Sequence, residues 1–331
     1  MTKRENAMAI LDRRQPEYYF DFMDAMTLVP DPALLRDAVA EDGHIHKDSW
    51  GTEFIWMPGS PGPHPVVTGD NAVIKDIERW QDFVKVPDLS QLDWSEAERM
   101  ASQVDRSEMF VGSYCPGGLF ERSHHLLGLQ EALMDYILYP DEMAELLRVI
   151  ADYKIALIKE MSKHMNPDVI FYHDDWGTKT SLFLPPDLWR RLIKPLHTEI
   201  IKTAHDCGMI FMHHADCFCE PLVTDMVEMG VDIWQGVIPQ NDIVAIQRVT
   251  GGKLALIGGV DGPGIDTEST TEDEVRAEAR RVVDTYCPAG RFFPGIAYGV
   301  LFQKKNHDIF IDEMKKYGRQ WALDHPVPEG N

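Results

Sequence analysis

From residue 109 to the end of the chain, short apolar runs alternate with longer stretches in which apolar residues recur at helical spacing. Nearly continuous apolar runs are typical of strands that are covered on both faces. Strands that alternate with helices predict parallel pairing through right-handed crossovers. The predicted strands are residues 109–114, 169–173, 210–214, 233–237, 254–257 and 291–293, and the predicted helices are residues 119–138, 141–164, 187–205, 220–229, 242–249, 271–286 and 306–323.

Two α/β architectures fit this alternation: a (β/α)8 TIM barrel and an open doubly wound sheet. No G-x-G-x-x-G motif follows an early strand, so the fingerprint of a dinucleotide-binding sheet is missing. Residues 18–22 and 53–56 add two predicted strands, which brings the strand–helix units to eight. We therefore predict a single-domain (β/α)8 TIM barrel over residues 1–331, with a helical and loop-rich extension at its N-terminus.

The charge balance narrows the classes of partner. The 331 residues include 32 Lys and Arg against 54 Asp and Glu, a net charge of −22. A basic surface is what nucleic acids and anionic membranes attract, so we expect neither as a partner. Five cysteines, three of them within residues 207–219, do not make a disulfide framework, and residues 7–11 are too short an apolar run for a signal peptide. We expect a cytoplasmic protein, and the sequence leaves a homo-oligomer open.

Polar residues gather where the predicted strands end. In a TIM barrel the carboxyl ends of the strands carry the chemistry, so this concentration predicts an enzyme. Asp261 and Tyr298 follow two of the later strands in this way. The polar strand ends lie in residues 172–177, 213–219, 258–262 and 295–299, and a further polar segment is residues 44–51.

The segment 213–219 suggests a metal site. Alternation along a strand places His214 and Asp216 on one face, from which both could bind one cation. Cys217 or Cys219 is close enough in the sequence to be a further ligand, and a set of histidine, carboxylate and thiolate suits Zn²⁺. The alternative is that His213 is a buried core histidine and that the cysteines are small apolar fillers.

Acidic residues supply the candidate catalytic groups. Asp174 and Asp175 are adjacent, so they face opposite ways, with His173 on the same face as Asp175. One aspartate could act on substrate or metal while the other caps a turn or orients a histidine; the alternative is that both are caps. Glu121 begins a predicted helix after a Gly-rich turn, where it could serve the site or compensate the helix dipole.

Taken together, these motifs resemble the uroporphyrinogen decarboxylase superfamily, which includes zinc- and corrinoid-dependent methyltransferases. The resemblance extends over nearly the whole chain, most clearly over residues 109–300, and it implies a distorted (β/α)8 barrel. The motifs that carry it are residues 112–116 (Gly-Ser-Tyr-Cys-Pro), 120–122 (Phe-Glu-Arg), 174–177 (Asp-Asp-Trp-Gly), 194–195 (Lys-Pro), 204–208 (Ala-His-Asp-Cys-Gly), 214–216 (His-Ala-Asp), 230–232 (Gly-Val-Asp) and 258–261 (Gly-Gly-Val-Asp).

The motifs of the chain depart from those of two branches of this superfamily. The decarboxylases carry an Arg-rich N-terminal motif, R-Q-A-G-R, whereas residues 12–16 here read Asp-Arg-Arg-Gln-Pro. The methyltransferases use a His-x-Cys pair and a further Cys near the last strand. His214 matches the histidine, Asp216 stands where the first Cys would be, and residues 296–298 offer no Cys. The resemblance therefore implies a methyltransferase, with a cofactor-free carboxy-lyase as the alternative and a noncatalytic binding protein as a third reading.

The resemblance also implies the cofactor and the partner. No D-x-H-x-x-G motif is present, so a separate corrinoid protein is expected to dock at the barrel mouth. Because Asp replaces Cys, the site favours a methyl group on oxygen, such as an aryl methyl ether, over a thiol acceptor. The expected residues are Asp174, Asp175, Glu121 and Tyr298 for catalysis, Trp50, Trp176, Trp234 and Asp261 for binding the cofactor or a flat substrate, and His214, Asp216 and Cys217 for zinc.

Overall fold

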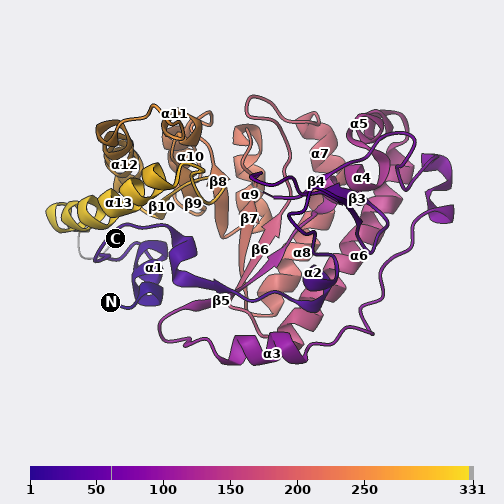
Figure 1. Cartoon of the computed structure of the whole chain (residues 1–331), viewed down its shortest axis with the longest axis horizontal. Helices are drawn as coiled ribbons and strands as arrows, with labels where there is room; N and C mark the ends of the chain where they lie inside the picture. The colour runs from indigo at the N-terminus through magenta and orange to yellow at the C-terminus, as the bar shows by residue number, and fades with distance from the viewer. Residues whose placement is uncertain (61, 328–331) are drawn as a thin grey trace.

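The computed structural model describes residues 1–60 and 62–327. A curled sheet of seven parallel strands forms its centre, and helices cover the outer face of that sheet (Figure 1). This arrangement confirms the predicted α/β barrel class. In spatial order the strands are β1 (Met26–Leu28), β5 (Phe110–Cys115), β6 (Val169–His173), β7 (Ile210–His214), β8 (Ile233–Val237), β9 (Ala255–Gly259) and β10 (Phe292–Gly295).

Most predicted helices are present, but two of them are broken. The predicted helix 119–138 is two helices, because Gly128 adopts a φ of 93° that ends the first. The predicted helix 187–205 breaks after Leu192, just before Pro195, which has no backbone N–H for helical bonding. The helices after β5 are α4 (Leu119–Leu127), α5 (Leu129–Leu138), α6 (Pro140–His164), α7 (Pro186–Leu192), α8 (Lys194–Asp206), α9 (Val223–Met229), α10 (Ile243–Val249), α11 (Gly262–Ile265), α12 (Glu272–Tyr286) and α13 (Lys304–Asp324).

The N-terminal part differs from the prediction. Residues 18–22 were expected to form a barrel strand, but they form none, and the 3-10 helix η1 (Phe22–Ala25) begins there. The Phe22 ring lies 5.3 Å from the ring of Phe293 on β10 and 5.3 Å from that of Phe110 on β5. No backbone pairing joins β1 to β10 in the described part of the chain, and the Phe22 side chain lies between β5 and β10.

The second expected barrel strand, residues 53–56, belongs to a separate sheet. It contributes β3 (Glu53–Ile55) to a small antiparallel sheet with β2 (Ile45–Lys47) and β4 (His64–Pro65). This sheet docks on α4, where Thr52 Oγ1 donates to the carbonyl of His125 at 3.2 Å. Short helices complete the extension: α1 (Lys3–Leu11), α2 (Pro32–Arg36), η2 (Ile77–Asp82) and α3 (Ser95–Ser102). The extent of a single domain over residues 1–331 stays a prediction.

Strand register decides which residues face the barrel interior. His173 on β6 pairs with His214 on β7, which pairs with Gln235 on β8, so these three side chains share the inner face. Their strand neighbours Tyr172 and His213 point outward, under the helices. No described helix is both long and apolar enough to cross a membrane.

Candidate functional site

Three side chains meet at the carboxyl ends of β6 and β7. His173, Asp175 and His214 each offer one potential ligand atom, and these atoms all lie within 4.8 Å of one another. The two imidazole rings stack with centroids 4.1 Å apart and an interplanar angle of 24°. The side-by-side register of the two strands produces this approach. We call these three residues the His–Asp–His cluster.

A second layer of contacts fixes both histidines in the same tautomer. Nδ1 of His173 lies 2.9 Å from a carboxylate oxygen of Glu121 in the first turn of α4. Nδ1 of His214 bonds Oε1 of Gln235, whose Nε2 donates to the carbonyl of Ala297 at 3.1 Å. Because a carbonyl only accepts, this bond fixes the orientation of the amide, and the His214 Nδ1 must carry the hydrogen. An ionised Glu121 only accepts, so with that carboxylate His173 also carries its hydrogen on Nδ1, and each neutral imidazole keeps a lone pair on Nε2.

The electrostatics of the site suit metal binding. Burial lowers the pKa of His173 and of His214, so both rings are neutral near pH 7. Burial raises the pKa of Asp175 to about 6 and that of Glu121 to about 7, and the neighbouring His214 opposes both shifts. Neutral imidazole and carboxylate are the forms that bind metals. Two nitrogens and one oxygen, with an outer carboxylate and amide behind the histidines, fit a three-ligand zinc site that keeps a position open for substrate.

Of the three predicted metal ligands, the structure brings only His214 into the cluster. The backbone N–H of Asp216 donates to Oδ1 of Asp175 at 3.1 Å, so Asp216 lies beside the cluster. The buried thiol of Cys217 lies 3.3 Å from the thiol of Cys219. Strand β7 ends at His214, so the alternation that predicted a shared face for position 216 no longer holds there.

Asp174 caps the start of α4. Its buried carboxylate accepts hydrogen bonds from the backbone N–H groups of Leu119 at 3.1 Å, Phe120 at 3.3 Å and Glu121 at 2.9 Å. The indole Nε1 of Trp176 donates to the same group at 3.0 Å. A side chain at position 118 would collide with Asp174, which explains the glycine there. These contacts position Glu121; a chemical role for Asp174 itself stays a prediction.

The three tryptophans predicted for cofactor or substrate binding are not brought to the cluster. Trp176 and Trp234 are buried on the helix-covered side of the sheet, and Nε1 of Trp234 donates to the carbonyl of Ala215 at 2.9 Å. Trp50 packs edge-on against the ring of Tyr153, with centroids 5.1 Å apart. Adjacent strand residues alternate in direction, so a tryptophan near a strand end can face the helices instead of the mouth.

The last two predicted residues lie farther along the chain, after β9 and β10. Asp261 is exposed and caps the short helix α11. The hydroxyl of Tyr298 donates to Oδ2 of Asp266 at 3.2 Å. Burial raises the pKa of Tyr298, and the charges of Asp266 and Asp216 contribute to the shift. The roles of Asp261 and Tyr298 stay predictions.

The sequence analysis did not name His173 as a candidate ligand, nor Gln235 and Tyr114 as neighbours of the site. The signal for His173 was present, since it shares a face with Asp175 and ends its strand as His214 ends the next one. Tyr114 lies on the inner face of β5, and its ring centroid lies 6.0 Å from that of His173. Nothing in the local pattern marks Gln235, which is a polar residue inside an otherwise apolar strand.

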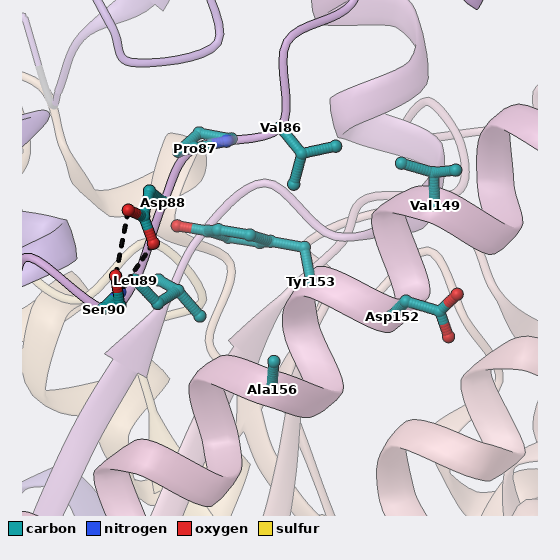
Figure 2. Close-up of a pocket in the computed structure, with 9 residues that line it drawn as sticks. All are labelled: Val86, Pro87, Asp88, Leu89, Ser90, Val149, Asp152, Tyr153 and Ala156. Atoms are coloured by element: carbon teal, nitrogen blue, oxygen red, sulfur yellow. Dashed lines mark hydrogen bonds between the residues drawn. The ribbon is translucent and has the colours of Figure 1, made fainter.

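A surface groove lies away from this site. It has a volume of about 400 Å³ and runs between residues 86–90 and the outer side of α6. Figure 2 shows the ring of Tyr153 in it, beside the hydrogen-bonded pair Asp88 and Ser90. No residue of the His–Asp–His cluster lines it. The lining residues are Val86, Pro87, Asp88, Leu89, Ser90, Val149, Asp152, Tyr153 and Ala156.

Comparisons with known proteins identify the family of the chain and similar folds. The family model for uroporphyrinogen decarboxylase (URO-D) matches residues 69–317. The fold is similar to that of a methyltransferase from Methanosarcina mazei, with a TM-score of 0.67, 16% identity, and 96% of this chain and 99% of that chain covered. The match to xylanase B from Clostridium stercorarium F9 has a TM-score of 0.39 and 13% identity, with 65% of this chain and 74% of that chain covered. No curated protein matches significantly. Since the family model covers most of the sequence, the chain belongs to the uroporphyrinogen decarboxylase (URO-D) family.

Proposed function

We propose that this protein is a methyltransferase of a corrinoid-dependent system, which moves a methyl group between a small methylated substrate and a separate corrinoid protein. The observation that carries the proposal is the His–Asp–His cluster, with an outer carboxylate and amide that leave both Nε2 atoms free. The similarity of fold to a methyltransferase supports the same conclusion.

The chain's own residues have distinct tasks in this proposal. His173, His214 and Asp175 hold a divalent metal, while Glu121 and Gln235 orient the two rings. A zinc ion bound there supplies Lewis acidity, which lowers the basicity of the atom that loses the methyl group. No thiol belongs to the cluster, so the ligand set is harder than one with a thiolate and favours an oxygen-bound methyl group, such as an aryl methyl ether.

The location of the N-terminal arginines argues against the carboxy-lyase alternative. Nη2 of Arg13 donates to the carbonyl of Gly251, which precedes β9, and Arg14 pairs with Asp12. These groups therefore lie at the amino end of the parallel strands, opposite the His–Asp–His cluster. An arginine segment that bound porphyrinogen carboxylates for decarboxylation would have to face the cluster.

The test starts with protein purified without chelator. We expect about one zinc per chain and conversion of the Co(I) spectrum of a reduced corrinoid protein to that of methyl-Co(III) when methoxyarenes are added. His214→Ala should lose both, whereas Cys217→Ala should keep both. The −22 chain should bind a partner with a basic docking patch in a salt-sensitive manner. No spectral change with aryl ethers, methylamines, methanol or methyl thiols would refute the proposal, and the lyase alternative would then lead.

A further inference from the structure

One hydroxyl beside the cluster has no assigned task. Tyr114 is part-exposed on the inner face of β5, and its ring stands at 86° to that of His173. The ring also packs against that of Phe171 on the same neighbouring strand, with centroids 5.3 Å apart. No residue in the described part of the chain accepts a hydrogen bond from the Tyr114 hydroxyl. The phenol is therefore held in place by its ring while its O–H remains open to a ligand.

The surroundings of Tyr114 keep this hydroxyl protonated. Burial raises its pKa, and the nearby carboxylates of Glu121 and Asp175 raise it further. Neither carboxylate accepts a hydrogen bond from the phenol; Glu121 contacts Nδ1 of His173, and Asp175 accepts from the backbone N–H of Asp216. A protonated hydroxyl beside a metal-ligand cluster is a ready hydrogen-bond donor for a group bound there.

Tyr172 provides a contrast from the neighbouring strand. Its hydroxyl also lacks a partner among the described residues, but that atom is fully buried on the helix-covered face of the sheet. The ring of Tyr172 packs against that of His197 on α8, with centroids 5.1 Å apart. No ligand in the barrel mouth reaches this hydroxyl. A hydroxyl without a partner is therefore not enough for a binding site; Tyr114 differs because it lies on the inner face and is accessible.

We propose that the hydroxyl of Tyr114 donates a hydrogen bond to the substrate atom that loses the methyl group, and that this atom is oxygen. This inference rests on the proposed methyltransferase function. The C–O bond breaks, the methyl carbon bonds to the Co(I) of the corrinoid partner, and both electrons of the C–O bond stay on the oxygen. The O–H of Tyr114 stabilises the resulting negative charge, and the released oxyanion takes its proton from water.

The same geometry selects the substrate class. An ether or alcohol oxygen has lone pairs that accept from a phenol, whereas a thioether sulfur is a weak acceptor and a quaternary ammonium has no lone pair. Together with a cluster that lacks a thiol ligand, Tyr114 therefore favours methyl groups on oxygen over those on sulfur or nitrogen.

The test compares Tyr114→Phe with the matched control Tyr172→Phe in zinc-loaded protein. The probe is 4-nitrophenolate, an aryl oxyanion whose absorbance reports its ionisation. Loss of one oxyanion donor should weaken its binding by about tenfold or more and slow demethylation of substituted anisoles by roughly 10²-fold, most for the poorest leaving groups. Zinc stoichiometry should be unchanged in both variants, and Tyr172→Phe should bind the probe like the wild type.

The outcomes separate this inference from the proposed function. Equal binding of 4-nitrophenolate by Tyr114→Phe and the wild type would overturn the inference, as would a zinc-loaded wild type that does not bind the probe. If Tyr114→Phe loses the probe while the wild type transfers no methyl group to any Co(I) corrinoid protein, the methyltransferase proposal is refuted, and Tyr114 is an oxyanion-binding group of another reaction.

Discussion

Replacing Gln235 tests the arrangement behind the cluster. Gln235→Leu removes the acceptor for Nδ1–H of His214 and the donor to the carbonyl of Ala297, and both partners are buried. Each buried polar group left without a partner costs about 1–3 kcal/mol, so we expect a loss of about 2–6 kcal/mol in the free energy of unfolding. For 331 residues, this loss lowers the Tm by roughly 3–9 °C.

The effect on the metal is the more specific measurement. Without Gln235, His214 is free to take the other tautomer or to rotate, and loss of such an outer contact typically lowers metal affinity about 10–100-fold. Gln235→Glu should behave differently, because its carboxylate still accepts from His214 Nδ1 but no longer donates to Ala297. We expect that variant to lose stability while keeping zinc affinity within a few fold of the wild type.

Asn241 offers a matched control. Its side chain is also a buried amide, which accepts from the backbone N–H of Cys219 and donates to the carbonyl of Cys217 without touching either histidine. Asn241→Leu should lower the Tm as Gln235→Leu does and leave zinc affinity unchanged. Zinc affinity is measured by competition with a chelator, and stability by thermal unfolding of the metal-free protein. If Gln235→Leu binds zinc as tightly as the wild type, the tautomer argument is refuted.

Four further variants test the remaining assignments. His214→Ala should reduce bound zinc to background by elemental analysis, while Cys217→Ala should retain it; the reverse result would restore the thiol as a ligand. Asp174→Asn should lower the free energy of unfolding by about 2–4 kcal/mol because it disturbs a cap with four donors, and a 10²-fold rate loss without a stability loss would instead show a chemical role. Glu121 has a folded pKa of about 7, above its ordinary value of 4.5, so its contribution to stability is lost as the pH rises toward 7. Metal-free Glu121→Gln should therefore gain stability relative to the wild type between about pH 5 and 8 in urea titrations, and a constant difference would contradict the raised pKa.

The sequence predicted the six later strands closely because each is a short run with two buried faces. Residues 169–173, 210–214 and 233–237 coincide with β6, β7 and β8. The prediction failed for two apolar segments that do not pair as strands of the main sheet. The aromatic composition of residues 18–22 is typical of a strand, but the segment forms none, and the side chain of Phe22 packs between β5 and β10. Residues 53–55 do form a strand, but it belongs to the small antiparallel sheet, and the local sequence pattern does not predict which sheet a strand joins.

The candidate site was predictable only as far as strand alternation could be followed. His214, which ends β7 on the inner face, was among the predicted metal ligands, and Asp175, two residues past the end of β6, was predicted as a catalytic group. Asp216 and Cys217 lie beyond the end of β7 at His214, where strand alternation no longer fixes the face of a side chain, and their role as ligands stays a prediction. Gln235 could not be predicted, because its role depends on hydrogen bonds to His214 and Ala297, which are far apart in the sequence.

The charge around the cluster gives an independent reason to expect a cation there. Asp175, Glu121 and Asp216 lie close enough to influence one another, and burial raises the pKa of the first two. The neighbouring His214 opposes both shifts, but burial lowers the pKa of His173 and of His214, so near pH 7 the two rings are mostly neutral. Carboxylates whose pKa values are raised at a partly buried site destabilise the folded chain when they ionise, whereas a divalent cation among them would lower their pKa values and hold the carboxylates ionised. The carboxylates that destabilise the metal-free protein would therefore be stabilised by a bound metal. Such stabilisation by a ligand is expected of a binding site and not of a simple structural core.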